Sequence, residues 1–186
     1  EGGYRAISVS SGLAAITTAL ISFLNAGDHL LMVDSAYGPA RNFCNTTLKR
    51  FGVETTYYDP MIGSGISDLI RPETKVLFTE SPGSYTFEIQ DIPAIAEVAH
   101  QNDIKVMIDN TWSAGYFFKP FEHGVDISIQ ATTKYQAGHA DVILGHIITK
   151  TEEDWHKIKV DTATLGQAVS PDVSYLCLRG LRTLSV

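Results

Sequence analysis

Short apolar runs alternate with helix-like segments along almost the whole chain, and this alternation constrains the fold more than any other feature. Most of these runs are bounded by polar residues and are too short for helices, which is typical of buried strands. The expected strands are residues 29–33, 54–58, 76–79, 106–109, 125–130 and 142–149. The expected helices are residues 12–24, 40–50, 92–101 and 152–160. Such strands, separated by helices, predict an α/β fold with a parallel sheet covered on both faces.

Length and composition narrow the class of protein further. A chain of 186 residues predicts one domain, since domains cluster near ~100–150 residues. Two cysteines exclude a disulfide scaffold, and a formal net charge of -7 with scattered basic residues argues against nucleic-acid binding. No apolar run approaches the roughly 18–20 residues of a membrane span. We therefore expect a soluble, cytoplasmic protein with neither a nucleic-acid nor a membrane partner.

The functional site of such a fold is expected at one edge of the sheet. In open α/β sheets, ligands bind outside the carboxyl ends of the strands. The segments to examine are therefore the polar ones that follow the apolar runs, together with the start of the first helix. These segments are residues 10–12, 34–37, 80–84, 109–112 and 130–134.

Ser11, Gly12 and Leu13 open the first expected helix. The unpaired N–H groups and the positive end of the helix dipole at such a position favour a phosphate group. An ordinary serine N-cap explains the same residues equally simply. The segment is neither a Walker loop nor a dinucleotide fingerprint, because it lacks both glycine patterns.

Three further residues follow apolar runs, and each has two interpretations. Asp109 ends the run of residues 106–109. It is either a buried carboxylate that needs a cationic partner or only a turn residue. Tyr37 could stack on a planar cofactor or pack in the core. Lys134 lies among small, aromatic and hydroxylic residues, which indicates a desolvated and nucleophilic amine rather than an ordinary surface lysine.

Metal and serine-hydrolase chemistry find little support in the sequence. His139, Asp141 and His146 match no common ligand spacing, and His146 lies among apolar residues, where a hydrogen-bonded core histidine is the better interpretation. The chain also lacks the G-x-S-x-G pattern of a nucleophile elbow. We therefore expect no metal site.

A helix N-terminus, an aromatic ring, an aspartate and a lysine, in that order, meet the requirements of pyridoxal 5′-phosphate (PLP). The chain resembles the trans-sulfuration, or Cys/Met-metabolism, family of fold-type I PLP-dependent enzymes. The motifs that carry the resemblance are SSGLAA, SAYGPARNFC, ESPGS, DNTWSAG, ATTKYQAGHADVILG and SYLCLRGLRTL, and together they span nearly the whole chain. The resemblance implies the large cofactor-binding domain of that fold, with a mostly parallel sheet.

The resemblance also implies roles for particular residues. Lys134 resembles the Schiff-base lysine and Tyr37 the ring-stacking tyrosine, and both are expected to act in catalysis. Asp109 resembles the carboxylate that keeps the pyridine nitrogen protonated. The residues expected to contact the cofactor are Ser11, Gly12, Leu13, Tyr37, Ser84, Asp109, Thr133 and Lys134. Many relatives have a phosphate-binding Ser where this chain has Ala131, and the sequence leaves open whether Thr132 compensates.

Within the family, residues 57–66 and the ESPGS motif of residues 80–84 most resemble the bacterial cystathionine β-lyase branch. That likeness implies β-elimination of L-cystathionine to homocysteine, pyruvate and ammonia, as in methionine biosynthesis, by a homotetramer built from dimers. Other trans-sulfuration activities stay open: cystathionine γ-lyase, γ-synthase and methionine γ-lyase.

The family holds the substrate carboxylate through a C-terminal domain and completes the phosphate site from a neighbouring subunit's N-terminal segment. We find neither segment in these 186 residues and expect them to be the cofactor-binding domain of a longer enzyme. Two further alternatives stay open. One is an inactive cofactor-domain fragment, and the other is a generic nucleotide-binding α/β domain, which the missing glycine fingerprints disfavour.

Overall fold

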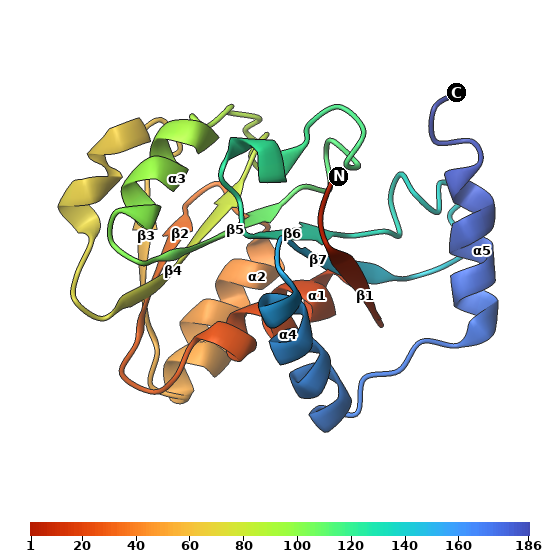
Figure 1. Cartoon of the computed structure of the whole chain (residues 1–186), viewed down its shortest axis with the longest axis horizontal. Coiled ribbons are helices and arrows are strands. Elements are labelled where there is room, and N and C mark those ends of the chain that lie inside the picture. The colour runs from red at the N-terminus through yellow and green to blue at the C-terminus, as the bar shows by residue number, and fades with distance from the viewer.

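Seven strands form one sheet in the order β1–β7–β6–β5–β4–β2–β3 in the computed structural model, which describes residues 1–186 (Figure 1). The strands are β1 (Arg5–Val9), β2 (His29–Val33), β3 (Glu54–Tyr58), β4 (Thr74–Glu80), β5 (Lys105–Asp109), β6 (Ile127–Gln130) and β7 (Gly145–Thr149). The pairs from β3 to β6 are parallel, whereas β7 runs antiparallel to both β6 and β1. The predicted mostly parallel sheet is confirmed.

Strand β7 lies within the predicted run of residues 142–149, but its antiparallel direction was not predicted, and neither was the edge strand β1. A parallel connection needs a crossover, usually a helix, whereas antiparallel neighbours can be joined without one. No helix lies between Gln130 and Gly145, so the chain returns along β6 in the opposite direction. That return segment carries Lys134.

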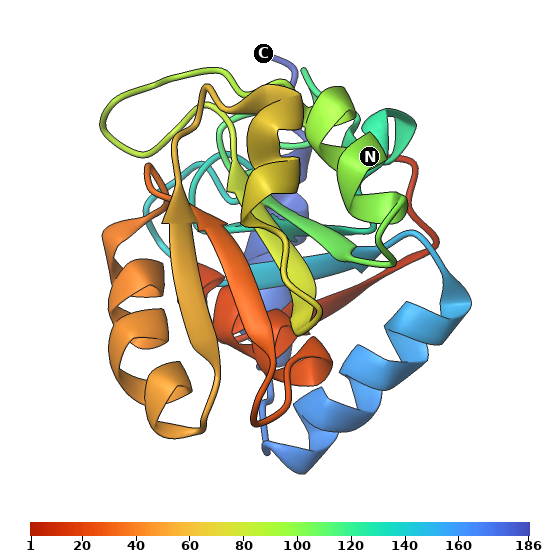
Figure 2. The ribbon, with the colours of Figure 1, turned by 90° about the vertical axis from the view of Figure 1, so that its left-hand side faces the viewer.

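Helices cover both faces of the sheet, as predicted (Figures 1 and 2). The five α-helices are α1 (Gly12–Phe23), α2 (Gly38–Phe43), α3 (Ile92–His100), α4 (Glu152–Thr164) and α5 (Pro171–Leu181). A π-helical turn (Cys44–Leu48) continues α2, and two 3-10 helices span Gly63–Leu69 and Pro120–His123. Helices α1, α2 and α4 lie on one face, and α3 lies on the other with both 3-10 helices.

Burial explains why the central strands were readable in the sequence. All five residues of β2 are buried, and so is the apolar run of residues 76–78 in β4. The edge strand β3, rich in Thr and Tyr, is only partly buried. Helix α1 turns Ala15, Ile16, Ala19 and Leu20 toward the sheet. Continuous apolar runs therefore mark the strands that are covered on both faces.

Helix α5 stands apart from the two helical layers (Figure 1). It packs closely at Gly180, where a Cβ atom would collide with the carbonyl oxygen of Ala137. Arg179 forms an ion pair with Asp141 from the segment between β6 and β7. These contacts place the C-terminal residues beside the carboxyl end of β6.

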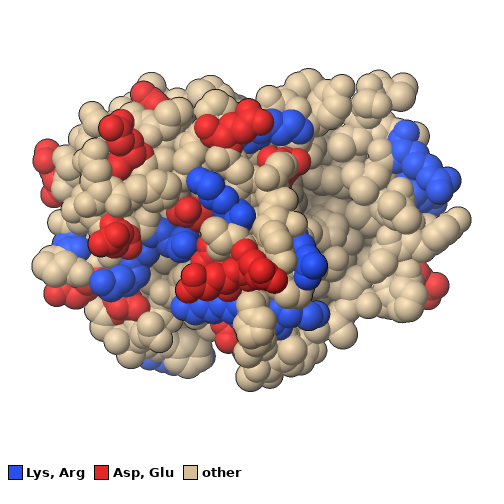
Figure 3. Space-filling view, in the orientation of Figure 1, with Lys and Arg blue, Asp and Glu red and all other residues tan.

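The molecular surface mixes both signs of charge. On the face shown in Figure 3, Lys and Arg lie interspersed with Asp and Glu over the part built by the helical layers, and the part toward α5 carries few charges. None of the helices has the length and apolar character required to cross a membrane.

Candidate active site

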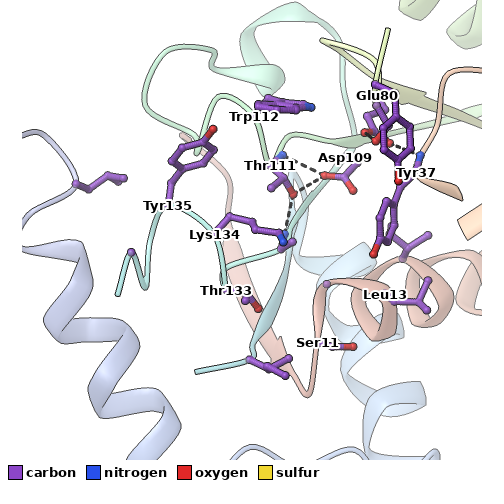
Figure 4. Close-up of a pocket in the computed structure, with 18 of the residues that line it drawn as sticks. Ser11, Leu13, Tyr37, Glu80, Asp109, Thr111, Trp112, Thr133, Lys134 and Tyr135 are labelled. Carbon is purple, nitrogen blue, oxygen red and sulfur yellow. Dashed lines mark hydrogen bonds between the residues drawn. The ribbon is translucent and has the colours of Figure 1, made fainter. Parts of the chain in front are cut away.

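A cavity of about 1060 Å³ opens at the carboxyl ends of β4, β5 and β6, beside the start of α1 (Figure 4). All eight residues that the sequence analysis assigned to the cofactor line this cavity: Ser11, Gly12, Leu13, Tyr37, Ser84, Asp109, Thr133 and Lys134. The structure therefore brings together side chains that are as far as 123 positions apart in the chain, from Ser11 to Lys134. Their roles stay predictions, but their common location matches the strand-end argument.

The start of α1 forms one end of the cavity. Ser11 is the N-cap, and its Oγ accepts a hydrogen bond from the N–H of Ala14 at 3.0 Å. The N–H groups of Gly12 and Leu13 fall in the first helical turn, where a helix provides no internal acceptor. A Cβ on Gly12 would lie 2.5 Å from the Cβ of Ala131, so only glycine lets the helix approach the loop after β6 this closely. The arrangement leaves N–H donors directed at an anion.

Asp109 is the last residue of β5 and is buried. Its Oδ1 accepts hydrogen bonds from the N–H and the Oγ1 of Thr111, at 3.0 and 2.6 Å. Burial raises the pKa of Asp109, and the two Thr111 bonds oppose that rise. No Lys or Arg pairs with this carboxylate in the chain, so it lacks the cationic partner that a buried charge needs.

Thr111 joins Asp109 to the lysine-bearing segment. Its Oγ1 donates to Asp109 and accepts a hydrogen bond of 2.8 Å from the N–H of Ala131. The sequence analysis included residue 111 in a candidate segment but gave it no role. Its signal was a hydroxyl two positions after a strand-terminal aspartate, which is the spacing of a local side-chain turn.

A second buried carboxylate, Glu80, was not predicted as a site residue. It ends β4 as Asp109 ends β5, and the two residues are in register on neighbouring parallel strands. Its Oε2 accepts from the N–H of Tyr37 at 2.7 Å, and its Oε1 accepts from the Oγ of Ser84 at 2.5 Å. Burial, and then the charge of Asp109, raise the pKa of Glu80 to about 8. The signal in the sequence was a carboxylate directly after the apolar run of residues 76–79.

Lys134 lies in a segment without helix or strand between β6 and β7, and its side chain reaches into the cavity (Figure 4). The side chain is exposed and forms no ion pair within the chain. The interpretation of Lys134 as a desolvated amine is therefore wrong for this structure. Small and aromatic neighbours in sequence do not bury a side chain that points into an open cavity.

The two threonines before Lys134 lie in different surroundings. Thr133 lines the cavity, and its Oγ1 donates to the carbonyl of Leu144 at 3.1 Å and accepts from its N–H at 3.0 Å. Thr132 is fully buried, and its Oγ1 lies 2.7 Å from Nδ1 of His146. Thr132 therefore does not supply the hydroxyl that Ala131 lacks. His146 is hydrogen-bonded, as the sequence analysis expected.

No metal centre is built from the residues considered for one. Nδ1 of His139 lies 2.6 Å from the carbonyl oxygen of Ala137, and Asp141 pairs with Arg179, which lowers the pKa of Asp141. The chain contains no group of three or more His, Cys, Asp or Glu side chains placed to hold a metal ion.

The residues of the cavity fit PLP. Free N–H groups at the start of α1 suit its phosphate, and a buried carboxylate without a cationic partner suits its ring nitrogen. The exposed Lys134 amine suits its aldehyde, and the partly exposed Tyr37 ring suits its aromatic face. The phosphate, the ring nitrogen, the aldehyde and the aromatic face of that cofactor each have a matching group in the cavity.

Comparison with known proteins agrees with this fit. The model of the family described as Cys/Met metabolism PLP-dependent enzyme matches residues 1–186. The cystathionine beta-lyase of Haemophilus influenzae is 47% identical over 100% of this chain and 47% of its own length. A Rhizobium johnstonii relative, provisionally named a cystathionine beta-lyase, is 53% identical over 100% of this chain and 47% of its own length.

The fold has solved counterparts as well. The structure of cystathionine gamma-lyase from Lactobacillus plantarum, complexed with L-serine, superposes with a TM-score of 0.95 at 35% identity, over 98% of this chain and 48% of that one. The chain thus spans about half the length of the relatives that it matches. The predicted fold class, the mostly parallel sheet of fold-type I enzymes, is confirmed.

Proposed function

The chain belongs to the Cys/Met metabolism PLP-dependent enzymes, and we propose that the complete protein is a carbon–sulfur lyase acting on L-cystathionine. The reaction is β-elimination: L-cystathionine and water give homocysteine, pyruvate and ammonia. The single observation that carries the proposal is the meeting of Lys134, Asp109 and the start of α1 in one cavity. The lyase names of relatives such as the Haemophilus influenzae enzyme, and the resemblance of ESPGS to the β-lyase branch, favour the β-elimination outcome.

The residues that would hold the cofactor divide by chemistry. The N–H groups of Gly12 and Leu13, with the hydroxyls of Ser11 and Thr133, would bind the phosphate. To donate to it, Thr133 would turn its hydroxyl proton away from the carbonyl of Leu144. The ring would lie against Tyr37, with Ser84 at its edge. When bound, PLP supplies an aldehyde for amines and a protonated ring that withdraws electron density from the substrate Cα.

Each remaining step can be assigned to this chain's own groups. The Asp109 carboxylate would hold the proton on the ring nitrogen, because that proton gives the buried charge its cationic partner. The free amine of Lys134 would take the proton from Cα of the substrate, and the bond between Cβ and sulfur would break with its electron pair leaving on the thiolate. A positioned general base of this kind typically contributes ~10²–10⁴-fold in rate.

Product analysis of the complete protein tests the proposed reaction. Incubation with L-cystathionine and PLP is expected to give homocysteine with pyruvate in equal amounts. Cysteine with 2-oxobutyrate would instead assign the γ-elimination that the neighbouring activities of this family perform. Absence of any thiol product with bound cofactor present would favour a protein that retains the site without the lyase reaction.

Three broader proposals follow from the same family membership. We propose that residues 1–186 are the cofactor-binding domain, that the complete protein is a tetramer built from dimers, and that it is cytoplasmic. Exposed aromatic side chains, Tyr85 at the cavity and the packed pair Tyr116 and Phe117 after β5, support an interface between copies. Sedimentation velocity is expected to show a tetramer, and a monomer at micromolar concentration would contradict the oligomer proposal.

A further inference from the structure

Glu80 connects two segments of the cavity wall, which one backbone hydrogen bond also joins, from the N–H of Ser84 to the carbonyl of Ser35 at 2.8 Å. Its two carboxyl oxygens hold the N–H of Tyr37, in the loop after β2, and the Oγ of Ser84, in the loop after β4. In Figure 4 its side chain lies beside Tyr37 and Asp109. The roles assigned above leave Glu80 without a function, although only 4% of its surface is exposed.

The cost of burying this carboxyl indicates that its two hydrogen bonds matter. Burying an ionisable group that has no cationic partner costs free energy. Here the group also stands beside a second buried carboxylate, since Glu80 and Asp109 are in register on adjacent strands. Packing alone does not call for a carboxyl at this position.

Tyr37 depends on this contact for its placement. The residue is 40% exposed, so packing from the chain does not enclose it. Residue 37 is the N-cap of α2, but its side chain makes no capping hydrogen bond. The bond to Glu80 is the side-chain hydrogen bond that fixes the backbone of residue 37.

We propose that Glu80 is a positioning residue of the cofactor site: its two hydrogen bonds fix the Ser84 hydroxyl and the main chain of Tyr37, from which the ring projects. The inference rests on the proposed cofactor but not on the identity of the products. Glu80 acts as the neutral acid: Oε2 accepts the N–H of Tyr37, and a proton on Oε1 is donated to the Oγ of Ser84, which reverses the direction that this hydrogen bond has when the carboxylate is ionised. Asp109 then bears the single negative charge, next to the ring nitrogen.

The neutral acid agrees with the raised pKa of Glu80, for which burial is the first cause and the charge of Asp109 the second. It also predicts that glutamine can replace Glu80. The amide oxygen of Glu80→Gln would accept the N–H of Tyr37, and its amide NH₂ would donate to Ser84. Alanine would remove both bonds.

The test measures cofactor binding in the complete protein, freed of PLP and titrated with it. The readouts are the dissociation constant of PLP and the visible circular dichroism per bound cofactor, which reports how rigidly the ring is held. Glu80→Ala is expected to raise the dissociation constant about tenfold or more, because one to two hydrogen bonds are lost. The same loss is expected to reduce the dichroism at least about twofold. Glu80→Gln is expected to keep both values within about twofold of the unchanged protein.

Thr79→Ala is the matched control. Thr79 precedes Glu80 in β4, is fully buried and donates one hydrogen bond of 3.1 Å to the carbonyl of Met107, but it does not line the cavity. It should lower stability and leave PLP binding unchanged. If Glu80→Ala does not fold, Glu80→Met keeps the volume without the hydrogen bonds, and Ser84→Ala removes one bond alone.

Two outcomes would overturn the inference. Unchanged affinity and dichroism in Glu80→Ala or Glu80→Met would show that the bonds do not position the ring. Equal damage in Glu80→Gln and Glu80→Ala would show that the negative charge acts instead. Failure of the unsubstituted protein to bind PLP would refute the proposed function, whereas an unexpected product from a protein that binds PLP would leave the Glu80 inference standing.

Discussion

The cavity has two walls of opposite character. The acidic wall, formed by Glu80, Asp109 and Thr111 at the ends of β4 and β5, is hydrogen-bonded, and its two carboxylates are buried. The lysine segment, residues 131–144 between β6 and β7, has no helix or strand and presents an exposed Lys134 without an ion pair. The difference indicates that electrostatic preorganisation resides in the sheet, while the reactive amine projects into the open cavity from the segment between β6 and β7.

The first and largest prediction removes the reactive group from the lysine segment. Lys134→Ala in the complete protein is expected to lower the rate of thiol release by at least ~10²–10⁴-fold, because a positioned base is lost. Steady-state assay with cystathionine measures it, and Lys150→Ala, a lysine beyond β7 and outside the cavity, is the matched control. Equal rates in the two variants would remove Lys134 from the reaction.

The second prediction removes the charge of the acidic wall. Asp109→Asn preserves shape and is expected to reduce kcat by roughly 10²–10³-fold, in the range of lost electrostatic stabilisers. Because the substitution also eliminates a buried charge, the free energy of unfolding of the cofactor-free protein should not fall. A retained kcat, or a large loss of stability, would contradict the assigned role.

The third prediction tests the connection between the two walls. Thr111→Val removes the hydroxyl that donates to Asp109 and accepts from the N–H of Ala131. The expected loss is about 1 kcal/mol in the free energy of unfolding, because the partly buried N–H of Ala131 loses its partner. Urea unfolding of the cofactor-free protein measures it, and a double-mutant cycle with Asp109→Asn should be non-additive. Additive effects would mean that the walls are independent.

The fourth prediction concerns pH and the acidic wall alone. The folded pKa of Glu80 is about 8, against an ordinary value of 4.5, so the unfolded chain releases this proton first as the pH rises. The folded state therefore binds more protons between about pH 4.5 and pH 8, and stability falls with rising pH across that window.

Glu80→Gln cannot ionise and should lose this dependence. Relative to the unsubstituted protein without PLP, it is expected to gain about 1 kcal/mol or more between pH 5 and pH 8, since one pH unit corresponds to about 1.4 kcal/mol at full effect. Urea unfolding at both pH values gives the difference. Parallel pH profiles for the two proteins would show that Glu80 ionises normally in the fold.

The same contrast explains how much of the molecule could be predicted from its sequence. Strands β2 and β5 were predicted because they form buried apolar runs, and the strand-end rule then located Tyr37 and Asp109 correctly. Glu80 was missed because a single acidic residue after a strand has no distinctive pattern until its neighbour on β5 is known. Pairing between strands is a tertiary property that local sequence does not contain.

The lysine segment was predicted less well. The position of Lys134 at the cavity was expected, but its burial was not predicted correctly, because solvent exposure depends on what covers the segment in space. The antiparallel direction of β7 was missed for a related reason, since an apolar run has the same appearance in either direction. Local residue patterns thus predict strands and their ends, while direction and exposure depend on contacts between distant segments.

Covalent mapping of the cofactor tests the central claim, that the two walls meet around PLP at Lys134. The complete protein is loaded with PLP, reduced with borohydride, digested and examined by mass spectrometry. The cofactor mass is expected on the peptide that contains Lys134 and on none that contains the chain's other seven lysines. Attachment at another lysine, or no attachment in a protein that binds PLP, would contradict the account.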